Sequence, residues 1–305
     1  MTTRLSPWRL GATLYMPATR TDIADVILKN KIPGLRSLVV CFEDAINDCD
    51  IPQSLINLQN LLTVVNADTT SNTNQKPLVF IRPRNSAMGL WLKENVNLAA
   101  VTGFVIPKFT QSALSDWWDI VKDTHLCMMP TLETEEVFDQ VQMRELATLL
   151  VSHPCRHQIV ALRIGGNDLM SLIALRRARD LTLYDGPMGY VIKMLIAVFA
   201  SRGFALTAPV CEHIDHHEIL AKELALDVHH GLVGKTAIHS NQVAIIEKAL
   251  RVNAHDYADA MQILNTSQAV FKSQGAMCEP ATHRRWALVI KERAQIYGIN
   301  GDTSI

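Results

Sequence analysis

The chain has 305 residues, of which 48% are hydrophobic and 19% are charged, and its formal net charge is −1. This composition excludes a disordered protein and leaves enough apolar residues for one large α/β barrel or two ordinary domains. The nearly neutral charge gives no electrostatic reason to expect nucleic acid or an anionic membrane as a partner.

No segment has the composition of a targeting or membrane-spanning element. The first ten residues, MTTRLSPWRL, lack the apolar core of a secretory signal peptide. The most apolar helical stretch, at 194–200, is far shorter than the roughly 18 apolar residues that suggest a membrane span. The six cysteines form no CxxC pair, which favours buried free thiols. We therefore predict a soluble, cytoplasmic protein that binds neither membranes nor nucleic acid.

Eight short apolar runs, taken in chain order, have the composition of β-strands. They begin at Ala12, Ser37, Pro77, Gly103, Leu126, Ile159, Phe204 and His230 and read ATLYMP, SLVVCFE, PLVFIR, GFVIP, LCMMP, IVALRIG, FALTAP and HGLVGK. Segments of helical pattern separate them, for example at 22–29, 112–122 and 135–150. This alternation is typical of βα units with a parallel sheet, and eight units in about 240 residues match a (β/α)8 barrel.

The alternative fold is an open, doubly wound sheet. We favour the barrel because no GxGxxG motif follows the first run and polar residues follow nearly every run. From Asn241 onward the pattern is wholly helical. We therefore predict an α/β TIM barrel over residues 1–250 and a C-terminal helical extension over 251–305, which is part of the same domain or an oligomer arm.

The loops after the eight runs are rich in polar residues. In a TIM barrel, the loops at the carboxyl ends of the strands form the active site. Those loops contain Tyr15, Pro17, Arg20, Glu43, Asp44, Arg82, Arg84, Lys108, Glu133, Thr134, Gly165, Gly166, Asn167, Asp168, Lys235 and His239. Two acids, Glu133 and Asp168, follow neighbouring strands and can converge on one divalent cation. Oxygen ligands completed by water suit Mg²⁺, which we predict as the cofactor.

Structural roles compete with this chemical interpretation of the acids. Glu133 and Asp168 can each stabilise the first turn of the helix that follows. Glu43 and Asp44 can form an ion pair with an arginine, either Arg20 or Arg82.

Two further groups have both a structural and a chemical interpretation. We expect Lys108 to pair with Glu43 or Glu133 rather than to form a Schiff base, because the nearby acids keep its ammonium charged. The histidines at 213, 216 and 217 have helical spacing and suggest zinc. A catalytic zinc site needs three well-placed ligands, so we favour a solvated helix face for these histidines.

Seven motifs, in barrel order, link the chain to a known family. They are LYMPATR, VVCFEDAI, FIRPRN, VIPK, PTLET, IGGNDL and GLVGKTAIHSNQV, and they span about Leu10 to Lys248. On these motifs the chain resembles the citrate lyase β-subunit-like (CitE-like) branch of the HpcH/HpaI aldolase superfamily. The doubled arginine of RPRN and the GGND sequence resemble a sub-branch of carbon–carbon lyases from bacterial stress-response (tellurite-type) gene clusters.

The resemblance implies a TIM-barrel lyase that assembles as a homo-oligomer, a trimer or hexamer. Such an enzyme uses Mg²⁺ to break or form a carbon–carbon bond in a small hydroxy-carboxylate or its CoA thioester. Glu133 and Asp168 would then be the metal ligands, and Arg82 would bind a substrate carboxylate or stabilise an enolate oxygen. Glu43 and Asp44 would hold the water ligands and take part in proton transfer. The predicted substrate-binding residues are Tyr15, Arg82, Arg84, Lys108, Gly165, Gly166 and Asn167.

Three features depart from the family pattern; the first changes the outer charge of the metal site, and the other two leave the use of CoA open. Asn167 and the TAPV sequence at 207–210 stand where acids are frequent, and Ser240 stands where proline is usual. One rival function is a phosphoenolpyruvate/pyruvate-type barrel, but TAPVCEHID lacks the glycines of a phosphate-binding loop. The other rival is a barrel without turnover that serves as an assembly or regulatory component of a bacterial stress-response system.

Overall fold

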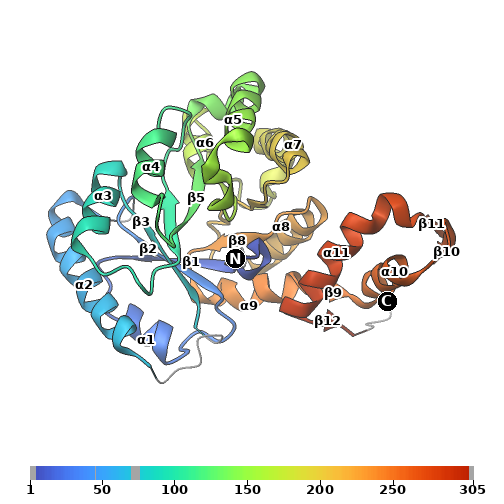
Figure 1. Ribbon diagram of the computed structural model, residues 1–305, viewed down its shortest axis with the longest axis horizontal. Helices are drawn as coiled ribbons and strands as arrows, with labels where there is room; N and C mark the ends of the chain where they lie inside the picture. Colours follow the sequence, from blue (N-terminus) through green and yellow to red (C-terminus); the bar gives the residue numbers. More distant parts are fainter. Residues whose placement is uncertain (1–4, 45, 70–75, 302–305) are drawn as a thin grey trace. The chain divides into compact units, whose positions relative to one another are not determined.

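Eight parallel strands form a single sheet in the computed structural model, which describes residues 5–44, 46–69 and 76–301 (Figure 1). The spatial order of the strands is β7-β6-β5-β4-β3-β2-β1-β8. A bridge between Ala208, just after β7, and Lys235 on β8 joins the two ends of this order. The sheet therefore closes on itself, which confirms the predicted TIM barrel and excludes the open sheet. The strands are β1 (Gly11–Pro17), β2 (Ser37–Cys41), β3 (Leu78–Arg82), β4 (Gly103–Ile106), β5 (Cys127–Leu132), β6 (Leu162–Ile164), β7 (Leu206–Thr207) and β8 (Gly234–Ala237).

Helices follow the strands and surround the barrel (Figure 1). They are α1 (Ile23–Leu28), α2 (Ile51–Ala67), α3 (Ser86–Asn95), α4 (Leu114–Val121), α5 (Gln140–Ser152), α6 (Gly166–Leu172), α7 (Pro187–Phe199), α8 (His217–His229) and α9 (Ser240–Ala249). Short 3-10 helices occur at Pro7–Arg9, Asp48–Asp50, Glu135–Phe138, Pro154–His157, Leu183–Asp185 and Ala200–Arg202. None of the helices in the described ranges combines the length and hydropathy that crossing a bilayer requires.

The α5 helix illustrates how the sequence determines a helix of this outer layer. Asp139 precedes it, and its carboxylate accepts a hydrogen bond from the Val141 amide at 2.8 Å. This contact satisfies a donor that the first turn would otherwise leave unpaired. Met143, Leu146 and Leu150 recur at helical spacing and are buried, so one apolar stripe faces the barrel.

The eighth strand of the barrel begins later than the sequence predicts. The apolar run at 230–235 indicated a strand from His230, but β8 starts at Gly234. The preceding residues close the end of α8 instead: the Leu232 amide donates to the Asp227 carbonyl, and Gly231 has φ of +77°. That left-handed conformation is readily available to glycine, which explains why the helix can end there.

Residues Glu247–Ile305 form a second compact unit. Its elements are β9 (Val252–Asn253), α10 (Ala254–Asn265), β10 (Phe271–Ser273), β11 (Ala276–Cys278), α11 (Pro280–Tyr297) and β12 (Ile299–Asn300). Its core contains Val252, Ala260, Ile263, Phe271, Cys278, Ala287 and Ile290. The expectation of a wholly helical C-terminal part was wrong, because β10 and β11 form an antiparallel hairpin and β9 pairs with β12. Whether this unit is an oligomer arm stays a prediction.

Candidate active site

The carboxyl ends of the strands surround a pocket of about 180 Å³. The structure brings together there both predicted metal ligands and most of the predicted substrate-binding residues. The lining residues are Tyr15, Asp44, Arg82, Thr131, Glu133, Arg163, Ile164, Gly165, Gly166, Asn167, Asp168, Val210, Thr236 and Ile238. Their convergence follows from the parallel sheet, which turns the end of every strand towards the same rim.

Arg82, at the end of β3, is the centre of an ion-pair cluster on this rim. Its buried guanidinium contacts a carboxylate oxygen of Glu43, lies 2.9 Å from Glu133 Oε1, and lies 3.8 Å from Asp44 Oδ2. The predicted ion pair of Glu43 and Asp44 therefore forms with Arg82. Arg20 pairs with Asp22 instead, at 2.7 Å.

Glu133 occupies an unusual position for a carboxylate. It directly follows β5 and is only 2% exposed. Its Oε1 accepts hydrogen bonds from Arg82 and from the Lys108 amide, whereas its buried Oε2 accepts none. Burial raises the pKa of Glu133 to about 7, although Arg82 acts against this shift. A buried oxygen without a donor is costly, so it is well suited to receive a cation.

Asp168 faces the same pocket from the first turn of α6. Burial, followed by the charge of Asp44, raises the pKa of Asp168, and the charge of Asp168 in turn raises the pKa of Glu133. Asp168 thus occupies the first-turn position that its structural interpretation predicted, and its role in stabilising the helix stays a prediction. That role is compatible with metal binding, because a first-turn carboxylate can keep an oxygen directed into the pocket.

Lys108 links the acids across the rim. Its Nζ donates to Glu43 Oε1 at 2.8 Å and lies 3.9 Å from Asp168 Oδ1. The hydrogen bond with Glu43 raises the pKa of Lys108, so the ammonium stays charged and the predicted pairing is confirmed. The backbone of Lys108 has φ of +45°, a strained conformation for a non-glycine residue. In this conformation its amide donates to Glu133.

The donor set of the rim fits a divalent cation. Four carboxylates, those of Glu43, Asp44, Glu133 and Asp168, face the two cations Arg82 and Lys108, which leaves a formal excess of two negative charges. Within the described ranges, no three His, Cys, Asp or Glu side chains form a group that could hold a metal by themselves. Two carboxylates with water or substrate in the other positions would suit Mg²⁺, which usually keeps several waters.

A family model described as “C-C bond lyase of the TIM-barrel fold” matches residues 4–299. The chain belongs to this family. The predicted relationship to carbon–carbon lyases with a TIM barrel is thereby confirmed, whereas the tellurite-type branch stays a prediction. No curated protein matched the sequence.

Solved structures similar to this lyase include citrate lyase and its β subunit. CitE from Mycobacterium tuberculosis in complex with magnesium, acetoacetate and coenzyme A has a TM-score of 0.66 at 18% identity, covering 94% of this chain and 99% of that one. A citrate lyase from Burkholderia xenovorans LB400 has a TM-score of 0.75 at 14% identity, covering 98% of each. The citrate lyase β subunit from M. tuberculosis complexed with oxaloacetate and magnesium has a TM-score of 0.57 at 16% identity, covering 79% and 98%. Identities this low establish the fold alone.

The pocket of this lyase also contains residues that sequence reasoning missed. Thr131, Arg163, Ile164, Val210, Thr236 and Ile238 line it. Arg163 left a signal in the sequence, because it is the one charged residue inside the apolar run IVALRIG. The others are apolar or small residues of the strands or their ends, which sequence alone does not distinguish from core residues.

Arg84 does not line the pocket. Its guanidinium donates to the carbonyls of Phe42 at 3.0 Å and Ile46 at 2.9 Å, and it also contacts the carboxylate of Asp48. It therefore ties the chain after β3 to the chain after β2. Because that second segment carries Glu43 and Asp44, Arg84 acts on the site by positioning it.

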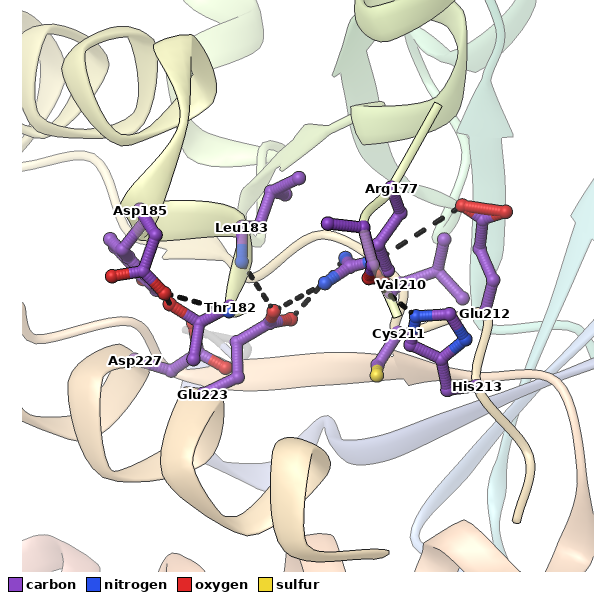
Figure 2. Close-up of polar contacts among 12 residues, drawn as sticks. Arg177, Thr182, Leu183, Asp185, Val210, Cys211, Glu212, His213, Glu223 and Asp227 are labelled. Atoms are coloured by element: carbon purple, nitrogen blue, oxygen red, sulfur yellow. Dashed lines mark hydrogen bonds and ion pairs between the residues drawn. The ribbon is translucent and has the colours of Figure 1, made fainter. Parts of the chain in front are cut away.

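A buried ion network lies beside Val210, one of the residues that line the pocket; Figure 2 shows Arg177, Glu223 and Val210. Arg177 contacts Glu223 on α8 at 2.5 Å and donates to the Val210 carbonyl at 2.6 Å. Lys235 on β8 donates to Glu223 at 2.7 Å and to Asp227 at 2.9 Å. The network therefore fixes Val210 relative to α8 and β8. Lys235, which sequence analysis placed in an active-site loop, belongs to this network and does not line the pocket.

The three histidines near α8 do not form the solvated helix face that we predicted. The α8 helix begins at His217, so His213 and His216 precede it. His213 bonds the Ala178 carbonyl through Nε2 at 2.8 Å, and its ring lies edge-on to that of His216. His213 thereby fastens the segment after β7 to the loop that contains Arg177.

Proposed function

We propose that this protein is a Mg²⁺-dependent lyase that breaks or forms a carbon–carbon bond in a small hydroxy-carboxylate or its CoA thioester. The observation that carries the proposal is the buried, donor-free oxygen of Glu133, a residue that lines a pocket together with Asp168 and Arg82. Similar folds bind magnesium with acetoacetate, coenzyme A or oxaloacetate, which supports this substrate class. Assembly as a trimer or hexamer and a cytoplasmic location stay predictions.

Different residues of the rim are suited to different tasks in a retro-aldol or retro-Claisen cleavage. In this reaction a base removes the hydroxyl proton of the substrate, the carbon–carbon bond breaks, and its electron pair moves onto an enolate oxygen. Glu133 and Asp168 would hold Mg²⁺, which supplies Lewis-acid polarisation of the substrate when bound. The Arg82 guanidinium is permanently charged and planar, and therefore suits a carboxylate or the developing enolate oxygen.

Glu43 is the side chain we assign to proton transfer, together with Asp44. Burial raises the pKa of Glu43, while Arg82 and Lys108 oppose the increase. A carboxylate with a raised pKa is a stronger base than an ordinary glutamate, which favours its use near neutral pH. Asp44 is exposed at the rim, where it can exchange protons with water.

The open pocket argues for turnover. A barrel that serves only as an assembly or regulatory component would be expected to have a mouth that is blocked by its own loops or has lost its acids. Here the pocket has about 180 Å³ of space and both predicted ligand carboxylates line it.

The test is a screen of hydroxy-acids and hydroxy-acyl-CoA esters for cleavage, with and without Mg²⁺. We expect Mg²⁺-dependent turnover that falls at least about 100-fold in Glu133→Ala, because removing one preorganised charge interaction costs about 3 kcal/mol of transition-state stabilisation. The matched control is Glu135→Ala, which removes an exposed acid two residues later and should leave turnover unchanged. Wild-type turnover in Glu133→Ala would remove Glu133 from the mechanism.

A further inference from the structure

Arg163 is a buried cation that the proposed chemistry leaves unused. It lies on β6, is 3% exposed, and lines the same pocket as Glu133. Its Nη2 donates to the hydroxyl of Thr236 on β8, and its guanidinium lies 5.1 Å from the centre of the Tyr15 ring. Its Nη1 is buried and donates to no acceptor.

The charge of Arg163 is uncompensated, unlike that of the other buried arginines of the barrel unit. Arg82 contacts three carboxylates, and Arg177 contacts Glu223. Within the described ranges, no carboxylate forms an ion pair with Arg163. A buried charge without a counter-charge is strongly unfavourable, so this arrangement indicates that the missing anion comes from a ligand.

Polar side chains flank Arg163 on both neighbouring strands, and one of them, Thr131, lines the pocket. Thr131 on β5 and Thr207 on β7 stand beside it in the strand register. The hydroxyls of both threonines are buried and lack hydrogen-bond partners. A typical TIM-barrel interior is filled by branched aliphatic side chains at such positions. Here a guanidinium and free hydroxyls lie together, which is the donor set that a carboxylate accepts from.

We propose that Arg163 binds a second, free carboxylate of the substrate, so that the preferred substrates are small dicarboxylates. This inference rests on the proposed function, in which the reacting end of the substrate lies at the acidic rim with Glu133 and Asp168. A dication balances the excess negative charge of that rim and leaves Arg163 as the unbalanced cation of the pocket. A carboxylate at Arg163 would supply the counter-charge that no side chain provides, whereas an uncharged group there would leave the guanidinium buried and unpaired.

The test compares two α-keto acids that differ by one carboxylate, oxaloacetate and pyruvate. Their affinities for the full chain are measured by calorimetry, with and without Mg²⁺. In Arg163→Met we expect oxaloacetate to bind about 10- to 100-fold more weakly, the effect of losing hydrogen bonds to a charged group, and pyruvate to change by less than about threefold. Arg163→Lys keeps the charge and should give an intermediate loss. The control is Arg144→Met, which removes an exposed arginine on α5 and should change neither affinity.

The melting temperature of the ligand-free variants separates binding from folding. Because Arg163 is uncompensated, Arg163→Met should melt at the same temperature as the wild type or higher. A lower melting temperature together with an equal loss of affinity for both acids would assign Arg163 a structural role and overturn the inference. Unchanged oxaloacetate affinity in Arg163→Met would overturn it as well.

The same titrations distinguish this inference from the proposed function. If Mg²⁺ does not strengthen the binding of either acid to the wild type, the proposed function is wrong. A loss of affinity in Arg163→Met that is confined to oxaloacetate would still support the role of Arg163. If Mg²⁺ strengthens binding but Arg163→Met lowers the affinities for oxaloacetate and pyruvate by the same factor, the inference is wrong and the proposed function stands. If the wild type binds neither acid, the inference fails, and the proposed function is then decided by the turnover screen of hydroxy-acids and hydroxy-acyl-CoA esters.

Discussion

Gly165 lies directly against the side chain of Glu133. A Cβ atom added to Gly165 would come closer than 3.0 Å to both the Oε2 and the Cβ of Glu133, a separation that real Cβ atoms essentially never show. The glycine after β6 therefore leaves the space in which the donor-free oxygen of Glu133 sits. This contact explains, in steric terms, why a glycine adjoins the metal-binding residues that we propose.

Gly165→Ala should displace the Glu133 carboxylate and weaken Mg²⁺ binding. We expect a loss of about tenfold or more in affinity, because metal sites need their ligands held close to the productive geometry. Calorimetric titration with Mg²⁺ measures this directly. Gly186→Ala is the matched control, since a Cβ there would meet nothing within 4 Å. Equal Mg²⁺ affinity in the Gly165 and Gly186 variants would contradict this steric account.

Lys108→Met should shift the pH profile of turnover. The hydrogen bond from Lys108 lowers the pKa of Glu43, so removing the ammonium lets burial raise that pKa further. If Glu43 must be ionised to accept the proton, the acid limb of the kcat profile moves to higher pH. Lys93→Met, which changes a lysine on α3 that bonds the Asp119 carbonyl, serves as the control. An acid limb that does not move would remove Glu43 from the titration that controls turnover.

The ionised Glu223 should make the free energy of unfolding depend on pH in the acid range. Burial alone would raise the pKa of Glu223, but Lys235 and Arg177 hold it down at about 2, below the ordinary value of 4.5. A depressed pKa means that the stabilisation is fully present above about pH 4.5 and is lost as the pH falls towards 2. The stability linked to this shift is about 3 kcal/mol.

Glu223→Gln isolates this contribution. Near pH 7 the variant should unfold at lower denaturant concentration than the wild type, because Arg177 and Lys235 lose a buried counter-charge. The difference should shrink as the pH is lowered from 4.5 towards 2. Glu218→Gln, at an exposed acid on α8, should match the wild type throughout. A stability difference that stays constant with pH would contradict the assigned pKa.

Much of the barrel could be predicted from local sequence, because a strand covered on both faces needs a continuous apolar run. The runs at β1 to β7 meet that condition and are strands. At β8 the apolar run begins before the strand, because the buried Leu232 bonds back to Asp227 on α8, whereas Val233, just before β8, already donates to the Leu206 carbonyl on β7. The strands of the C-terminal unit have only two or three residues. Segments this short carry no period of their own, and pairing with a distant segment makes them strands.

The positions of the acids after the apolar runs predict which of them share a rim, because a closed parallel sheet directs the ends of all its strands to one side. The sequence does not predict which cationic side chains contact those acids. Arg82 and Arg84 are two residues apart with similar sequence surroundings, yet Arg82 enters the pocket and Arg84 binds backbone carbonyls. In the sequence, Arg163 is a charged residue within an apolar run that has the composition of a core strand. Only the closure of the barrel turns its guanidinium inwards, across to Thr236, since that contact joins strands 73 residues apart in the chain.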